Sequence, residues 1–309
     1  MLRDYADPAH PRTVCTFGAS LTYGTHLIDA RHVVINACND GDCRNAVVDL
    51  PDVRYHWFVL PHPRHTVPQL VAVSPNLDEV AWISSKNDGT GRRLHLTRAD
   101  GDHAVASLRD VGGRCGSPED SKLGDYTRSG RMIYVLDVPI GSDAVLLVFA
   151  GMEKQLAQRP PAGGWPYGKW PAFPVWTPDG STLYFRSGGH GWQWNLGGGR
   201  HPFAPAADWR YPTITPDGRH LAWARIREDG FHDIYLMDMF VGGQPKLIAR
   251  RSTTPAFLND DQLWFVREGR GVCGTGANDR VIYSVTERTT AGSIIQGVWG
   301  IWPATSSNF

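Results

Sequence analysis

The sequence predicts an all-β fold, a six-bladed β-propeller whose blades are four-stranded antiparallel sheets. The first observation is a repeated pattern of an apolar strand, a short polar turn and a second strand rich in aliphatic and aromatic residues. The second observation is its spacing, because the second strands centre near residues 34, 81, 133, 184, 222 and 264. A blade of four short strands needs roughly 40–50 residues, which fits this period. The third is the near absence of helix signals: only 151–158 reads as a helical turn, ended by Pro160 and Pro161.

The turn between the first two strands is clearest in two copies of the repeat. The copies at 174–185 and 212–223 both contain Thr-Pro-Asp-Gly. The more degenerate copies lie at 23–35, 68–82, 125–134 and 255–265. In such a turn Pro fixes φ, Asp accepts hydrogen bonds from the turn and Gly supplies a positive φ. The residues to which we assign this structural role are Asp179, Gly180, Asp217 and Gly218.

Residues 1–309 are expected to form a single propeller domain. Hydrophobic residues make up 41% of the chain, enough for a core, and 34 Gly and 22 Pro suit many short turns. In a closed propeller the N- and C-terminal strands join in one blade, so that the sheet edges are paired. We therefore expect the apolar strand at 13–15 to meet the apolar segment at 297–302, closing the ring.

Charge and hydropathy exclude several classes of partner. The 31 basic and 31 acidic residues balance, without a long run of either sign, whereas a nucleic-acid groove needs clustered Lys and Arg. No stretch approaches the 18 apolar residues of a membrane span, and residues 1–8 lack the apolar core of a secretory signal. We expect a soluble monomer without membrane insertion that is cytoplasmic, or periplasmic or secreted if the sequence is a mature fragment.

The five cysteines are an odd number for a disulfide framework. Cys38 and Cys43 flank a turn, and both a disulfide across a hairpin and two reduced thiols fit that arrangement. Cys15, Cys115 and Cys273 are expected to be free. No Cys-x-x-Cys pair is present, so a zinc site built from these residues is not predicted.

The repeat resembles that of the TolB-like β-propeller family, which carries Ser/Thr-Pro-Asp-Gly turns and an Ile-Tyr-x-Met-Asp strand. Residues 234–238, Ile-Tyr-Leu-Met-Asp, match that strand, and the resemblance covers about residues 13–300. It implies a propeller, and propellers of this type serve as protein-binding platforms, as lyases and as the gating domain of serine peptidases. The N-terminal α/β domain of TolB is not expected here, because the first predicted strand begins near residue 13. The Gly-x-Ser-x-Gly turn of the peptidase relatives is also missing, so a serine hydrolase is not predicted.

Propeller geometry indicates where a binding site lies. The Pro-Asp-Gly turns share one face, and the blade connectors share the other with the loops between second and third strands. The connector at 159–171 sets three large aromatic residues among Pro and Gly, and these residues are Trp165, Tyr167 and Trp170. They are candidates for stacking on sugar rings or on a partner's side chains. In the alternative, they fold back and seal the core. Trp192 and Trp194 alternate along a strand, as expected for packing between blades.

Further candidates are expected on the connector face. Those for ligand binding are His62, His65, Trp209, Arg210 and Tyr211. His190 and His232 are candidate ligands for a divalent metal, because imidazole is a common ligand for several metals.

Two functions remain open from the sequence. The first is a non-catalytic propeller that binds a protein, peptide or glycan on the connector face, without a cofactor. The alternative is a metal-assisted lyase or hydrolase acting on a saccharide in the central funnel. As a resemblance, propeller lyases that cut acidic sugars use a metal or Arg to neutralise the uronate carboxylate while His or Tyr abstracts the α-proton.

Overall fold

Six four-stranded antiparallel sheets make up most of the structure, a computed structural model. It describes residues 2–4, 12–15, 25–28, 31–39, 42–49, 52, 54–61, 64–86, 88–109, 124–137, 144–166, 169–268 and 279–292. Within them the helical content is one three-residue 3-10 helix, η2 (Ala204–Ala206). None of the described helical structure is long and apolar enough to cross a membrane. The predictions of an all-β fold and of six four-stranded blades are confirmed.

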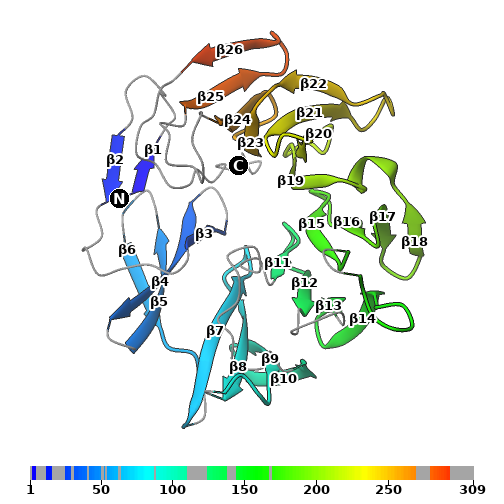
Figure 1. Cartoon of the computed structure of the whole chain (residues 1–309). Coiled ribbons are helices and arrows are strands. Elements are labelled where there is room, and N and C mark those ends of the chain that lie inside the picture. The colour runs from blue at the N-terminus through cyan, green and yellow to red at the C-terminus, as the bar shows by residue number, and fades with distance from the viewer. Residues whose placement is uncertain are drawn as a thin grey trace. The chain divides into compact units, whose positions relative to one another are not determined.

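Each blade consists of four strands that follow one another in the chain, and Figure 1 labels them. In chain order the blades are β3 (Thr25–Leu27), β4 (His32–Asn39), β5 (Asp42–Asp49) and β6 (Arg54–Phe58); β7 (Thr66–Val73), β8 (Glu79–Lys86), β9 (Arg93–Arg98) and β10 (Gly101–Ser107); β11 (Gly124–Tyr126), β12 (Met132–Asp137), β13 (Val145–Ala150) and β14 (Glu153–Gln158); β15 (Ala172–Trp176), β16 (Thr182–Ser187), β17 (His190–Asn195) and β18 (Gly199–Pro202); β19 (Trp209–Ile214), β20 (His220–Ile226), β21 (His232–Asp238) and β22 (Lys246–Ala249); and β23 (Ser252–Phe257), β24 (Gln262–Arg267), β25 (Asp279–Ser284) and β26 (Thr289–Gly292). The predicted repeat centres all fall in the second strand of their blade.

The helical turn expected at 151–158 is wrong, because this segment forms β14. Gly151 has a φ of 60°, which turns the chain, and Glu153 then faces Ala150 across the ladder. The backbone hydrogen bonds to β13 supply partners that a short isolated helical turn would not have. Tertiary pairing therefore decides the structure of this segment.

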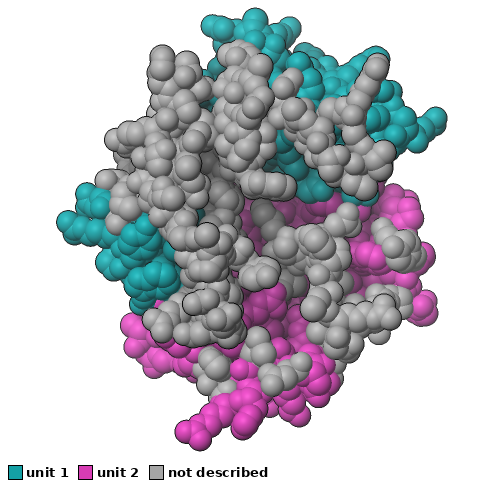
Figure 2. All heavy atoms as spheres, turned by 60° about the vertical axis from the view of Figure 1, so that its left-hand side comes forward, with its two compact units in different colours: residues 1–57, 208–309 teal, residues 58–207 magenta. Residues whose placement is uncertain are grey.

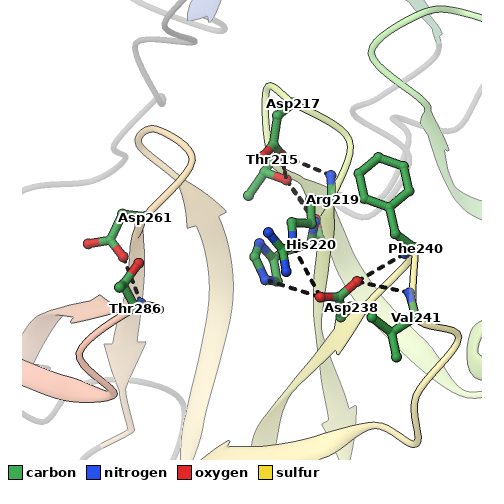
Figure 3. A network of polar contacts seen from close by, with 9 residues as sticks. All are labelled: Thr215, Asp217, Arg219, His220, Asp238, Phe240, Val241, Asp261 and Thr286. Carbon is green, nitrogen blue, oxygen red and sulfur yellow. Dashed lines mark hydrogen bonds and ion pairs between the residues drawn. The ribbon is translucent and has the colours of Figure 1, made fainter.

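The Thr-Pro-Asp-Gly turns have the structural role predicted for them. In the fifth blade Thr215 Oγ1 donates to Asp217 Oδ1 at 2.6 Å, and the backbone N–H of His220 donates to Thr215 Oγ1 at 2.8 Å (Figure 3). The backbone N–H of Arg219 also donates to Asp217 Oδ1. In the fourth blade Thr177 and Asp179 make the corresponding bond at 2.6 Å. Gly180 and Gly218 have φ of 71° and 76°, which favours glycine.

Turns of successive blades contact one another. Asn76 Nδ2 donates to the backbone carbonyl of Ser129 at 3.1 Å, linking the turns of blades two and three. The backbone N–H of Asp217 donates to Asp260 Oδ1 at 2.8 Å, linking those of blades five and six. Neighbouring turns thus gather on the same side of their blades, as the propeller geometry requires.

The chain divides into two compact units, coloured teal and magenta in Figure 2. One comprises Met1–Trp57 and Asp208–Phe309, and the other Phe58–Ala207. In the second unit, Tyr134 of β12 and Leu146 of β13 pack with Phe185 of β16 in a core shared by blades three and four. The expectation of a single domain stays a prediction.

Ring closure also stays a prediction. The strand that contains residues 13–15 is β2 (Arg12–Cys15), and it pairs with β1 (Leu2–Asp4). Its expected partner at 297–302 lies outside the described residues. The backbones of Cys38 and Cys43 face each other across the hairpin of β4 and β5, as the turn between them predicted.

Candidate functional site: a cleft between blades three and four

A cleft of about 650 Å³ lies between the third and fourth blades, within the unit Phe58–Ala207. The end of β14, the connector that follows it, and the strands β17 and β18 line it. Its lining residues are Leu156, Ala157, Gln158, Arg159, Pro160, Pro161, Trp165, Ser187, Gly188, His190, Trp192, Trp194, Gly199 and Arg200. The described part of the lining includes two arginines and a histidine but no carboxylate.

The hairpin that joins β16 to β17 forms one wall of the cleft. Ser187 faces His190 across the ladder, and the two residues between them, Gly188 and Gly189, have φ of 64° and 81°. Two successive positive φ values are the signature of a type I′ turn, in which glycine is the least strained residue. The ring of His190 lies edge-on to that of Trp192, with centroids 6.1 Å apart. The tight turn therefore sets an imidazole beside an indole at the rim.

The aromatic connector packs against this hairpin. The Trp165 side chain is only 8% exposed, and its Nε1–H donates to the carbonyl of Ala144 at 2.9 Å. The backbone N–H of Gly188 donates to the carbonyl of Lys169 at 2.6 Å. Trp165 thus seals the junction, as in the alternative drawn from the sequence, and also borders the cleft. Trp170 is partly buried and outside the lining, and Tyr167 lies outside the described residues.

An arginine stacks on the second indole of the cleft. The guanidinium carbon of Arg200 lies 4.0 Å from the centroid of the Trp192 ring, and Trp192 Nε1–H donates to the carbonyl of Ser187 at 3.2 Å. Desolvation lowers the pKa of Arg200. Among the described residues, no carboxylate pairs with Arg200 or with Arg159. The indole therefore holds the cation by a cation–π contact and leaves its N–H groups unused by acidic partners among the described residues.

Two buried polar atoms of the cleft lack a hydrogen-bond partner among the described residues. They are Oε1 of Gln158, a residue 6% exposed, and Oγ of Ser187, a residue 2% exposed. A buried polar group without a partner costs about 1–3 kcal/mol, and such groups are rare in native proteins. Both residues line the cleft, but the two atoms themselves have almost no solvent-accessible surface, so a ligand bound there reaches them once the side chains turn toward it.

The other predicted aromatic group lies in β19, within the unit that comprises Met1–Trp57 and Asp208–Phe309. Trp209 is fully buried, Arg210 is partly buried and Tyr211 is 37% exposed. Tyr211 has a φ of 51° and sits at a β-bulge before Pro212. The same residue-Pro bulge recurs at Phe173 in β15 and Thr254 in β23. The three positions are equivalent in the repeat, so the bulge is a feature of the blade.

The predicted histidines lie in separate surroundings. His65 is exposed, and His62 lies outside the described residues. His232 Nδ1 lies 2.8 Å from Glu268 Oε1, and its backbone N–H donates to Glu268 Oε2 at 2.7 Å. His190 and His232 belong to different units. In the described part of the chain, no group of three or more His, Cys, Asp or Glu residues could hold a metal ion.

Comparison with known proteins identifies the fold. No protein-family model matches the sequence, and no curated protein matches it. Among solved structures, an oligogalacturonate lyase in complex with manganese matches with a TM-score of 0.58 and 14% identity, over 92% of this chain and 80% of that one. The β-propeller domain of the Trilobed protease from Pyrococcus furiosus matches with a TM-score of 0.58 and 10% identity, over 90% and 85%. The chain has a β-propeller fold.

The likeness to these propellers extends to the fold alone. TolB from Acinetobacter baumannii matches with a TM-score of 0.48 and 12% identity, over 80% of this chain, and this chain spans 58% of its length. That score carries no argument about function. The oligogalacturonate lyase is in complex with manganese. The described residues of this chain contain no group of three or more His, Cys, Asp or Glu side chains that could hold such an ion.

Sequence reasoning identified part of the cleft and missed the rest. It named Trp165 and His190, which the structure brings into one lining. It missed Gln158, Ser187 and Arg200, which gain their role only when two blades pack together. One signal was available, because a hairpin that closes near Gly197 places Arg200 beside Trp192 and Trp194.

Proposed function

We propose that this propeller is a non-catalytic glycan-binding protein and that the cleft between blades three and four holds the sugar. The observation that carries the proposal is the pair of buried polar atoms, Gln158 Oε1 and Ser187 Oγ, that lack partners in its lining. Folding leaves both groups without the hydrogen bonds that water gives them in the unfolded chain. A bound ligand would restore those bonds.

The size of the cleft favours a small ligand over a protein surface. Its volume of about 650 Å³ lies within the range of roughly 300–1,000 Å³ that is usual for small-molecule sites. A stable protein partner would cover about 800 Å² on each side, which is more than a concave site of this kind offers.

The chemistry of the lining favours a sugar. A hydroxyl group both donates and accepts, so one sugar hydroxyl could donate to Gln158 Oε1 while another accepts from Ser187 Oγ. The indole edges of Trp165 and Trp192 supply apolar surface for the C–H groups of the ring. Protein and peptide ligands remain alternatives that the binding test below distinguishes.

The test is binding of a panel of immobilised oligosaccharides and peptides by the full chain. Wild type is expected to retain at least one oligosaccharide, and the double variant Gln158→Met with Ser187→Ala is expected to lose at least about tenfold in affinity. Gln193→Met is the matched control, because Gln193 lies in the same strand as His190 but outside the lining. Retention of peptides alone, or equal binding by the double variant, would overturn the proposal.

The same experiment separates binding from the lyase alternative. Mass spectrometry of the recovered oligosaccharide, with and without added manganese, is expected to show an unchanged chain length. Shortened products that depend on the metal would instead support the metal-assisted lyase.

A further inference from the structure

Among the residues that the structure describes, the cleft lining carries a positive charge without a balancing acidic group. Of the fourteen described lining residues, Arg159 and Arg200 are basic, His190 is titratable and none is acidic. The chain as a whole has equal numbers of acidic and basic residues, so this local excess of basic residues is a property of the site. Elsewhere arginines pair readily: Arg92 bonds Asp137 at 3.1 Å, and Arg219 bonds Asp238 at 3.1 Å.

Arg200 is held ready for an anion. Its guanidinium carbon lies over the Trp192 ring, 4.0 Å from the ring centroid, and Trp192 Nε1–H is bonded to the carbonyl of Ser187 in the hairpin. A guanidinium stacked by one face keeps its N–H groups free around its edge. That edge forms two parallel hydrogen bonds with a planar oxyanion. Loss of hydration on the stacked face disfavours the charged form, which is why the pKa of Arg200 is lowered.

The two buried polar groups in the same lining, Gln158 Oε1 and Ser187 Oγ, need a different kind of contact. Gln158 Oε1 can only accept a hydrogen bond, so its partner must donate one. Ser187 Oγ can donate or accept. An anion without a hydrogen-bond donor, such as acetate, would satisfy the arginine but leave the amide oxygen unpaired. A ligand that carries both an oxyanion and hydroxyl groups would satisfy all three.

We infer that the cleft is specific for an acidic sugar, whose carboxylate or sulfate pairs with Arg200 while its hydroxyl groups bond to Gln158 and Ser187. This inference rests on the proposed function and names the ligand class of the same site. Arg159, on the same lining, adds long-range attraction for the anion. The site lies between two blades, on residues that come from β14 to β18.

Calorimetric titration of the full chain with matched sugars tests this inference. The probes are a disaccharide ending in glucuronic acid, its glucose counterpart and its 6-sulfated glucose counterpart. Wild type is expected to bind at least one acidic probe about tenfold more tightly than the neutral one, with an affinity that falls as salt rises. The acidic probe that binds more tightly, the glucuronic acid disaccharide or the sulfated one, identifies the oxyanion as carboxylate or sulfate.

Variants of Arg200 show whether this residue is responsible for the preference for acidic over neutral sugars. Arg200→Gln is expected to bind acidic and neutral probes equally, and Arg200→Lys to keep part of the preference because it retains the charge without the planar fork. Arg93→Gln, an exposed arginine of β9 outside the lining, is the control and is expected to match wild type. Equal binding of neutral and acidic probes by wild type would overturn this inference while leaving glycan binding intact. Binding of none of the probes, together with failure of the oligosaccharide panel, would overturn both.

Discussion

Ser84 Oγ lies 2.9 Å from Nε2 of His95, and Nδ1 of the same ring lies 2.8 Å from Asp102 Oδ2. The order serine, histidine, aspartate is that of a hydrolase triad. Here Ser84 is 6% exposed and His95 is 8% exposed, and the Trp82 ring stacks on the imidazole with centroids 4.1 Å apart. The set therefore crosslinks β8, β9 and β10 within the second blade.

Ser84→Ala is expected to destabilise the protein by about 1–3 kcal/mol, because it leaves a buried nitrogen of His95 without a partner. Urea unfolding of the variant measures this loss. Ser107→Ala, at an exposed position of β10, is expected to stay within about 0.5 kcal/mol of wild type. Equal stability of the two variants would mean that this crosslink contributes nothing.

Asp137→Ala is expected to cost about 3–5 kcal/mol, since it leaves the buried charge of Arg92 without a carboxylate and with only the carbonyl of Arg109 as a partner among the described residues. Arg92 and Asp137 are 5% and 2% exposed, and their side chains bond at 3.1 Å between blades two and three. Asp52→Ala removes the partner of Arg54 in an exposed pair and is expected to change stability by less than about 1 kcal/mol. Chemical denaturation of both variants measures the two losses in the free energy of unfolding.

Acid is expected to weaken the fourth-blade turn. The hydroxyl of Thr177 donates to Asp179, as does the N–H of Ser181, and these bonds lower the pKa of Asp179 below 3.8. A carboxylate with a lowered pKa in the folded state contributes stability above the unfolded value, and loses it as pH falls through the folded value. Asp179→Asn should therefore show a smaller fall in Tm between about pH 7 and about pH 3 than wild type. An unchanged pH profile would contradict this origin of the acid sensitivity.

Gly191→Ala is expected to destabilise the fourth blade by at least about 1–3 kcal/mol, through overpacking. A Cβ at this position would lie 1.9 Å from the carbonyl oxygen of Phe203, which belongs to the backbone and has little room to move. Gly243 has open space around its Cβ direction, so Gly243→Ala serves as the control. Thermal unfolding of the two variants checks the difference. Equal Tm values would show that η2 moves aside without a loss of stability.

The sequence predicted the blades well because their determinants are local. A Thr and an Asp two residues apart, as at Thr215 and Asp217, close the turn through their own side chains. The cleft was predicted in part, from the unusual composition around Trp165. Gln158 could not be recognised, since its role follows from the pairing of β14 with β13 and from the packing of a neighbouring blade. The charge of Arg200 is informative only once the described lining is known to hold no carboxylate.

The most direct measurement is the nuclear magnetic resonance spectrum of the tryptophan indole N–H groups during titration with an acidic disaccharide. Single Trp→Phe variants assign the signals. Trp165 and Trp192 line the cleft, whereas Trp82 lies in the second blade and Trp209 in the other unit. The signals of Trp165 and Trp192 are predicted to shift together and to saturate, while those of Trp82 and Trp209 stay in place. A shift of Trp209 without one of Trp192 would place the binding site elsewhere and contradict the account.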